Sequence, residues 1–182
     1  STVYLSNAPS LGGSMTLSNA GISGFLVLRP LQVGTGRNSD QRIISCVLGT
    51  SNDYDSTSRF MLAVQQQSTE IRFYRAGVSI PRTNFNASNN YIISWTYDGS
   101  INSMYLNGSE ADLQQNDVLS NVAFNTNVYR LGSPANNTFD TYNGHIGEVI
   151  VYNDFLPVAQ RRIVEGYLAW KWGIAPSLGT TF

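Results

Sequence analysis

Only one segment of this chain has clear helical periodicity, and it lies near the C-terminal end. Pro157 suits the first turn of a helix, and Gly173 suits the left-handed residue that ends one. The apolar residues that recur at helical spacing between them are Ala159, Ile163, Tyr167 and Trp170, with Val164, Leu168 and Trp172 beside them. The pattern predicts a helix over about residues 157–172 whose apolar stripe packs on the rest of the protein. One late helix cannot supply the crossover connections of a parallel sheet, so we expect antiparallel strands.

The residues before this helix alternate between short apolar runs and turn signals. Asp98-Gly99 and Asn107-Gly108 are the sharpest hairpin turns. The predicted strands are 22–31, 42–48, 59–65, 70–76, 91–97, 102–107, 118–124, 127–131 and 146–152, with one or two more within 1–17. The β-branched run Ile146–Tyr152 is expected to be buried on both faces. With 182 residues, we predict one domain over 1–182, an all-β antiparallel sandwich of two sheets with one C-terminal helix.

A family resemblance follows from landmarks spread along the chain. In order, they are Phe25–Pro30, Arg42–Gly49, Ile93–Gly99, Met104–Gly108, Tyr129–Gly132, Gly144–Glu148 and the tail Gly166–Gly173. This series resembles the laminin-G-like, concanavalin A-like jelly-roll domains of lectins and glucanases. The version with the Tyr-Leu-Ala-Trp-Lys-Trp-Gly tail resembles domains of phage and large-DNA-virus proteins. One departure is visible, because Pro157 and Gln160 replace the capping box that starts the helix in relatives.

Charge and composition narrow the range of partners. Charged residues make up only 13% of the chain, the net charge is −1, and no basic stripe is present, which argues against nucleic acid. No apolar run is long enough to span a bilayer, so we expect no membrane insertion. The single cysteine, Cys46, lies in a strand and is expected to be a buried thiol.

The acidic residues and the one histidine do not form a recognisable catalytic pattern. Retaining glycoside hydrolysis needs two carboxylates about 5–5.5 Å apart, and the four glutamates, Glu70, Glu110, Glu148 and Glu165, are widely separated in sequence. His145 lies on the last strand without a nucleophile elbow nearby, so we interpret it as a strand histidine. We interpret Glu148 as a structural acid at the strand end. The prediction is therefore that the protein is not an enzyme.

Two long polar loops carry the residue types that bind sugars. An aromatic platform beside neutral hydrogen-bonding groups suits an uncharged glycan. The candidate ligand-binding residues are Asn52, Asp53, Tyr54 and Asp55 in one loop and Asn136, Asn137, Phe139, Asp140 and Tyr142 in the other. The alternative is that these loops are merely polar, with Phe139 and Tyr142 packing the second loop down. Relatives often bind calcium at loop ends, so the resemblance also implies a calcium site that would use Asp53, Asp55 and Asp140.

Together, these features predict a non-enzymatic module of a virion, in a capsid decoration, tail or fibre protein of a phage or large DNA virus. We expect a homo-oligomer at the virion surface that contacts other virion proteins and binds a host-surface glycan. The alternative is a soluble, extracellular glycan-binding lectin of cellular origin. A glycoside hydrolase is the third reading.

Overall fold

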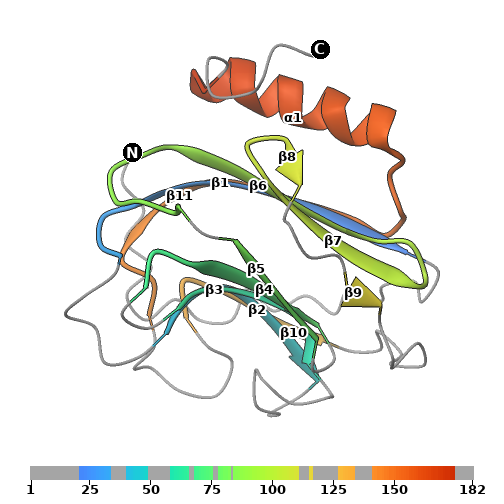
Figure 1. Ribbon diagram of the computed structural model, residues 1–182, viewed down its shortest axis with the longest axis horizontal. Helices are drawn as coiled ribbons and strands as arrows, with labels where there is room; N and C mark the ends of the chain where they lie inside the picture. The colour runs from blue at the N-terminus through green and yellow to red at the C-terminus, as the bar shows by residue number, and fades with distance from the viewer. Residues whose placement is uncertain are drawn as a thin grey trace.

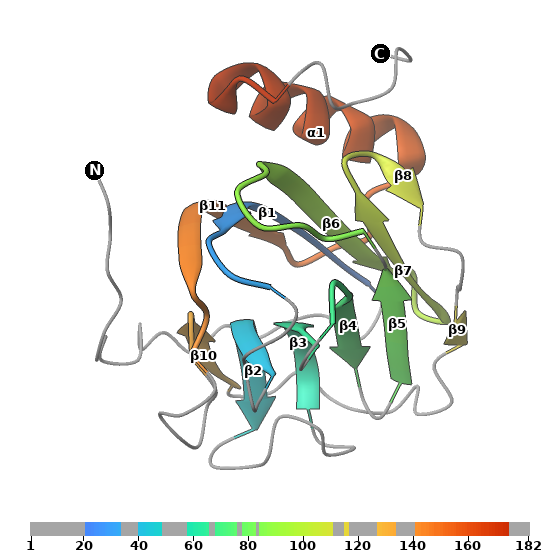
Figure 2. The same ribbon diagram turned by 60° about the vertical axis from the view of Figure 1, so that its left-hand side comes forward.

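In the computed structural model, two β-sheets face each other and one helix covers the outer face of one of them (Figure 1). The structure describes residues 21–33, 40–48, 58–65, 68–75, 78–82, 84–110, 115–116, 127–133 and 141–174. Figure 2, a rotated view, separates the two layers and shows the helix on the side away from the second sheet. Every strand pairing within the two sheets is antiparallel. The predicted antiparallel jelly-roll sandwich with a C-terminal helix is confirmed.

The sheet beneath the helix has six strands, in the order β11-β1-β6-β7-β8, with β9 also paired to β7. Its strands are β1 (Ile22–Pro30), β6 (Tyr91–Tyr97), β7 (Ile101–Leu106), β8 (Ser109–Glu110), β9 (Gln115–Asn116) and β11 (Gly144–Tyr152). The helix is α1 (Val158–Trp172). Chain order and spatial order differ, because the first described strand pairs with the last one.

The second sheet has five strands, in the order β10-β2-β3-β4-β5. Its strands are β2 (Gln41–Leu48), β3 (Ser58–Val64), β4 (Ile71–Arg75), β5 (Val78–Arg82) and β10 (Asn127–Leu131). Strand β5 was not predicted from the sequence, because Pro81 interrupts its short apolar run. Proline is tolerated there because β5 is an edge strand. The expected strands within 1–17 and 118–124 lie outside the described residues.

The two sharpest predicted turns are present. Asn107 and Gly108 both have positive φ, 50° and 78°, and join β7 to β8. Asp98 accepts hydrogen bonds at Oδ1 from the backbone N–H of Ser100 and Ile101, at 2.9 and 2.7 Å. These local bonds hold the β6–β7 hairpin.

Trp95 is the centre of the core between the two sheets. Its ring is fully buried and lies 5.4 Å from the ring of Phe60 and 6.1 Å from that of Phe73, measured between centroids. Gly24 on β1 makes room for it, since a Cβ there would lie 2.0 Å from Trp95 Cζ2. The buried thiol of Cys46 belongs to the same core.

A second, smaller core lies between the six-stranded sheet and the helix. Its residues are Phe25, Val27, Ile92, Leu168, Ala169 and Ile174. Because β1 and β6 have the other sheet on one face and α1 on the other, both strands are buried along almost their whole length. The helix begins after Pro157, which makes no side-chain capping bond, and ends at Gly173, where φ is 66°.

Two sequence-based expectations about burial are wrong. The apolar stripe of the helix faces outward: Ile163 is 71% exposed and Trp170 is 80% exposed, whereas Arg161 and Glu165 are buried. The side of the helix that faces the sheet instead carries the polar pair Arg161 and Glu165 together with the apolar residues Leu168 and Ala169. The last strand, β11, is half-buried rather than buried on both faces, because it lies at the sheet edge.

Candidate functional site

Of the nine predicted ligand-binding residues, the structure describes only Tyr142. Asn52, Asp53, Tyr54, Asp55, Asn136, Asn137, Phe139 and Asp140 lie outside the described residues, as do all three predicted calcium ligands. Their role stays a prediction. The strands that flank the two loops are nevertheless placed. Leu131 pairs with Ile44 and Thr141 bridges Arg42, so the second loop leaves the start of β2.

The first loop leaves the opposite end of β2. It connects Leu48, the last residue of β2, to Ser58, the first residue of β3. The six residue steps from Arg42 to Leu48 span roughly 20 Å. The described flanks of the two loops are therefore separated by about that distance.

Tyr142 packs inward. Its side chain lies against the core between the sheets, and its ring approaches Gly144 so closely that a Cβ there would lie 2.5 Å from Tyr142 Cζ. Its backbone N–H donates to the carbonyl oxygen of Gly132 at 2.9 Å. Burial raises the pKa of the Tyr142 phenol well above its ordinary value. This placement agrees with the alternative in which the residue packs its loop down.

A pocket of about 190 Å³ lies on the outer face of the six-stranded sheet, beside the C-terminal end of the helix. Residues from β1, the turn before β6, β11 and the end of α1 meet there. The lining residues are Val27, Leu28, Arg29, Asn90, His145, Gly147, Trp172 and Ile174. Its wall is mostly apolar, with three polar side chains among the lining residues. A concave apolar site with a few polar groups is the default candidate for ligand binding.

Trp172 is held in place at this pocket by contacts from β11. Its indole Nε1–H donates to Glu148 Oε2 at 2.8 Å, and Lys171 Nζ lies 2.9 Å from the same oxygen. The ring covers Gly147, where a Cβ would lie 2.8 Å from Trp172 Cη2. Gly147 is the extra residue of a bulge, because Glu148 pairs with Val27 and Ile146 pairs with Leu28. Because Gly147 has no side chain, the Trp172 indole can pack directly against the backbone at this position.

The Trp172 hydrogen bond, followed by Lys171, lowers the pKa of Glu148. The carboxylate is thus ionised at neutral pH and fixes the indole orientation. This role is structural, as the sequence analysis expected, although Glu148 lies within β11 rather than at its end.

The polar part of the pocket comes from three elements. His145 on β11 pairs across the sheet with Arg29 on β1, and Asn90 precedes β6. His145 is half-buried, as expected of a strand histidine, yet it also lines the pocket. The sequence assigned Trp172 to the apolar part of the helix that was expected to pack. Asn90 and Arg29 were not singled out, because they lie far apart in the chain. Gly147, between His145 and Glu148, was the only local sign in the sequence of the bulge that alters the alternation of side chains along β11.

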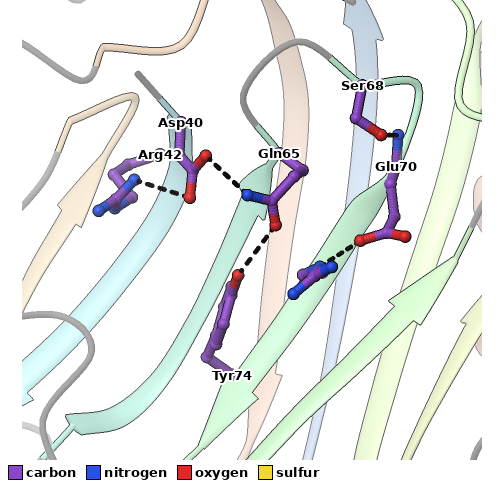
Figure 3. Close-up of polar contacts among 7 residues, drawn as sticks. Asp40, Arg42, Gln65, Ser68, Glu70 and Tyr74 are labelled. Carbon is purple, nitrogen blue, oxygen red and sulfur yellow. Dashed lines mark hydrogen bonds and ion pairs between the residues drawn. The ribbon is translucent and has the colours of Figure 1, made fainter. Parts of the chain in front are cut away.

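A separate polar network follows the ends of β2, β3 and β4 on the other sheet (Figure 3). Asp40 Oδ1 accepts from Gln65 Nε2 at 3.2 Å, and Gln65 Oε1 accepts from the Tyr74 hydroxyl at 3.5 Å. Asp40 also faces Arg42 at 3.8 Å, while Glu70 pairs with Arg72 next to it. The carboxylates of this network are used in contacts within the sheet. We interpret it as a support for the strand ends.

Among the described residues, no group of three or more His, Cys, Asp or Glu side chains could hold a metal. Within the same part of the chain, no helix is long and apolar enough to cross a membrane.

Comparisons with known proteins identify the fold and no family. No protein-family model matches the chain, and no curated protein matches its sequence. Solved structures do match. A Trypanosoma rangeli sialidase in complex with 2,3-difluoro-KDN superposes with a TM-score of 0.66 at 14% identity, covering 84% of this chain and 23% of the sialidase. This chain thus spans about a quarter of the length of that enzyme.

Two further matches are a heptameric SAP-like pentraxin from Limulus polyphemus and botulinum neurotoxin type C. The pentraxin has a TM-score of 0.61 at 13% identity, covering 84% of this chain and 72% of the pentraxin. The toxin, whose cell entry depends upon interaction with two ganglioside molecules, has a TM-score of 0.63 at 13% identity, covering 84% of this chain and 36% of the toxin. At such identities, the likeness establishes a shared lectin-like sandwich fold.

Proposed function

We propose that this protein is a non-enzymatic glycan-binding module and that the pocket beside Trp172 holds one sugar ring. The observation that carries the proposal is the anchored indole at the rim of a small, mainly apolar pocket with His145, Asn90 and Arg29 around it. The volume of about 190 Å³ suits a single six-membered ring, since a cavity of about 150 Å³ accepts benzene.

The chemistry of the lining matches that of a sugar. A sugar ring has apolar C–H faces and a belt of hydroxyl groups. The indole and the wall of Val27, Leu28 and Ile174 can cover an apolar face or an N-acetyl methyl group. Asn90 and His145 each offer a donor and an acceptor, and Arg29 offers donors only. A neutral or anionic sugar is therefore favoured over a cationic ligand.

The structural neighbours support the same class of function. The matched neurotoxin depends on gangliosides, which carry glycans, and the sialidase was solved with a sugar analogue. The sialidase match covers only 23% of the enzyme, so it gives no support for sialidase activity in this chain. A non-enzymatic role is supported by the contacts of Glu148, whose two carboxylate oxygens are already engaged by Lys171 Nζ and the Trp172 indole N–H.

For the biological setting, we propose the surface of a virion of a phage or large DNA virus, with other virion proteins as partners. The support is the resemblance of the Gly166–Gly173 tail. An extracellular lectin of cellular origin is the alternative, and the two differ in whether the chain occurs in purified particles. The two polar loops are further proposed contact areas. Because their described flanks lie about 20 Å apart, calcium is proposed at Asp53 and Asp55 in the first loop or at Asp140 in the second.

A glycan array probed with calcium and with chelator tests binding and selects a ligand. Calorimetry with that soluble, monovalent glycan then tests the site. Trp172→Ala and His145→Ala are expected to reduce affinity at least tenfold, while Trp170→Ala, two residues away and outside the pocket, serves as the matched control. Binding that is lost in Asp53→Asn but kept in Trp172→Ala would move the site to the loops. No binding in either array condition would overturn the proposal.

A further inference from the structure

The outward face of α1 has the residue pattern of a helix-packing seam, although nothing in the described structure packs on it. Ala159, Ile163, Gly166 and Trp170 follow the spacing i, i+4, i+7, i+11 and so form one line along the helix. Ile163 is 71% exposed and Trp170 is 80% exposed, and Tyr167 beside them is 47% exposed. The opposite side of the helix, with Arg161, Glu165 and Leu168, contacts the sheet.

Charge on this face has one sign. Arg162 and Lys171 are exposed, whereas the only carboxylate within α1, Glu165, is buried against the sheet. Lys171 is paired with Glu148, which leaves the Arg162 guanidinium as the cation beside the seam. The indole of Trp170 is an attractive partner for a guanidinium, because the negative face of an aromatic ring attracts a cation placed over it.

These residues are arranged symmetrically about Gly166. Arg162 lies four residues before it and Trp170 four residues after it, while Ala159 and Gly173 lie seven residues before and after. In an antiparallel pair of identical helices that cross at Gly166, each Arg162 faces the other copy's Trp170. A two-fold interface requires this relation, in which residue i contacts residue j and residue j contacts residue i.

We propose that a second copy of this chain packs on this face, with the two α1 helices antiparallel and their crossing point at Gly166. Along the interface, layers of small residues then alternate with layers of large ones. Gly166 of one copy faces Gly166 of the other, and Ala159 of one copy faces Gly173 of the other. The small residues let the helix backbones approach closely, and the large side chains of Ile163 and Trp170 fill the space between those layers. The pairing is independent of the glycan pocket, because Trp172 lies on the sheet side of the helix.

The size of the contact sets its strength. A 15-residue helix is roughly 22 Å long and about 10 Å wide. This strip is smaller than the roughly 800 Å² per partner of a standard stable interface. The dimer is therefore expected to be weak for an isolated domain and to depend on concentration.

Sedimentation velocity over a wide concentration range tests the pairing in the intact chain. The wild type is expected to shift from monomer to dimer as concentration rises, and Trp170→Lys, which places a cation opposite Arg162, is expected to remain monomeric. Adding Arg162→Glu to Trp170→Lys creates an opposite-charge pair in the same register and is expected to restore the dimer. Leu31→Ser, which alters another exposed apolar residue away from the helix, is the control and should behave as wild type.

Cross-linking tests the crossing point directly. Gly166→Cys places a thiol beside the two-fold axis, and Cys46 is buried, so oxidation should yield a single covalent dimer. A wild type that stays monomeric at every concentration would overturn the proposal. So would a dimer that Trp170→Lys leaves intact, or a charge-swapped double variant that stays monomeric.

Discussion

Glu165 of the helix accepts a hydrogen bond from the Ser94 hydroxyl of β6, 71 residues earlier in the chain. The same carboxylate oxygen lies 2.5 Å from Arg161 Nη1, and the Arg161 guanidinium lies 3.6 Å from the centroid of the Tyr105 ring. Glu165 and Arg161 are both almost fully buried. The helix is thus fixed to the sheet by an ion pair at the centre of its packed face.

Breaking this pair on one side should be costly. Glu165→Ala leaves the Arg161 charge buried without its counter-ion, so we expect a loss of about 3–5 kcal/mol in the free energy of unfolding. Urea denaturation measures this loss. Gln160→Ala, at an exposed position next to Arg161, should change stability by less than about 0.5 kcal/mol. A small effect of Glu165→Ala would mean that the carboxylate does not hold the helix.

The same pair explains why the sequence predicted the wrong face of the helix. Apolar periodicity selects the line through Ile163 and Trp170, because charged residues are normally solvated. Arg161 and Glu165 are buried only because Ser94 and Tyr105 from distant strands complete their contacts. No local pattern reveals those partners. The strands, by contrast, were predictable where apolar runs end in turns of fixed chemistry, as at Asp98-Gly99 and Asn107-Gly108.

Two glycines should respond differently to the same substitution. Gly24→Ala would place a Cβ 2.0 Å from the Trp95 ring, which is fully buried and cannot move, so we expect a loss of about 1–3 kcal/mol or more. Gly147→Ala meets the Trp172 ring, which is 40% exposed and can swing outward. Its stability loss should be smaller, but it should weaken glycan binding. Equal stability losses in urea would contradict this account of the two sites.

The anchor of Trp172 should depend on pH. The pKa of Glu148 is lowered in the folded protein, so its stabilising effect is complete above the ordinary value of 4.5 and is lost as pH falls through the lower folded value. Below pH 4.5 we therefore expect the Trp172 indole signal to move progressively in NMR spectra. Glu148→Gln keeps an acceptor oxygen but cannot titrate, so it should abolish that movement. A movement that persists in Glu148→Gln must come from another group.

Tyr142→Phe separates the two roles considered for that residue. Its hydroxyl is buried and has no hydrogen-bond partner among the described residues. Removing an unsatisfied buried hydroxyl should leave stability unchanged or raise it by up to about 1 kcal/mol. Glycan affinity should stay the same by calorimetry. A clear loss of affinity would instead support a direct contact between Tyr142 and the ligand.

The site was less predictable than the fold for a physical reason. The pocket joins Arg29, Asn90, His145 and Trp172, which come from four separate elements and meet only after the first and last described strands have paired. The sequence assigned His145 and Glu148 structural roles, which the structure supports for Glu148. The bulge at Gly147, against which the Trp172 indole packs, depends on the register of β11 with β1.

The three tryptophans make the most direct test of the binding proposal. In the free protein, the indole N–H groups of Trp95, Trp170 and Trp172 occupy three different surroundings: the core, solvent and the Glu148 carboxylate. Titration of ¹⁵N-labelled protein with a glycan selected on the array should shift the Trp172 indole signal, with backbone shifts at Asn90 and His145. The Trp95 and Trp170 indole signals should stay in place. Saturable binding that leaves the Trp172 signal unmoved would contradict the assignment of the pocket as the glycan site.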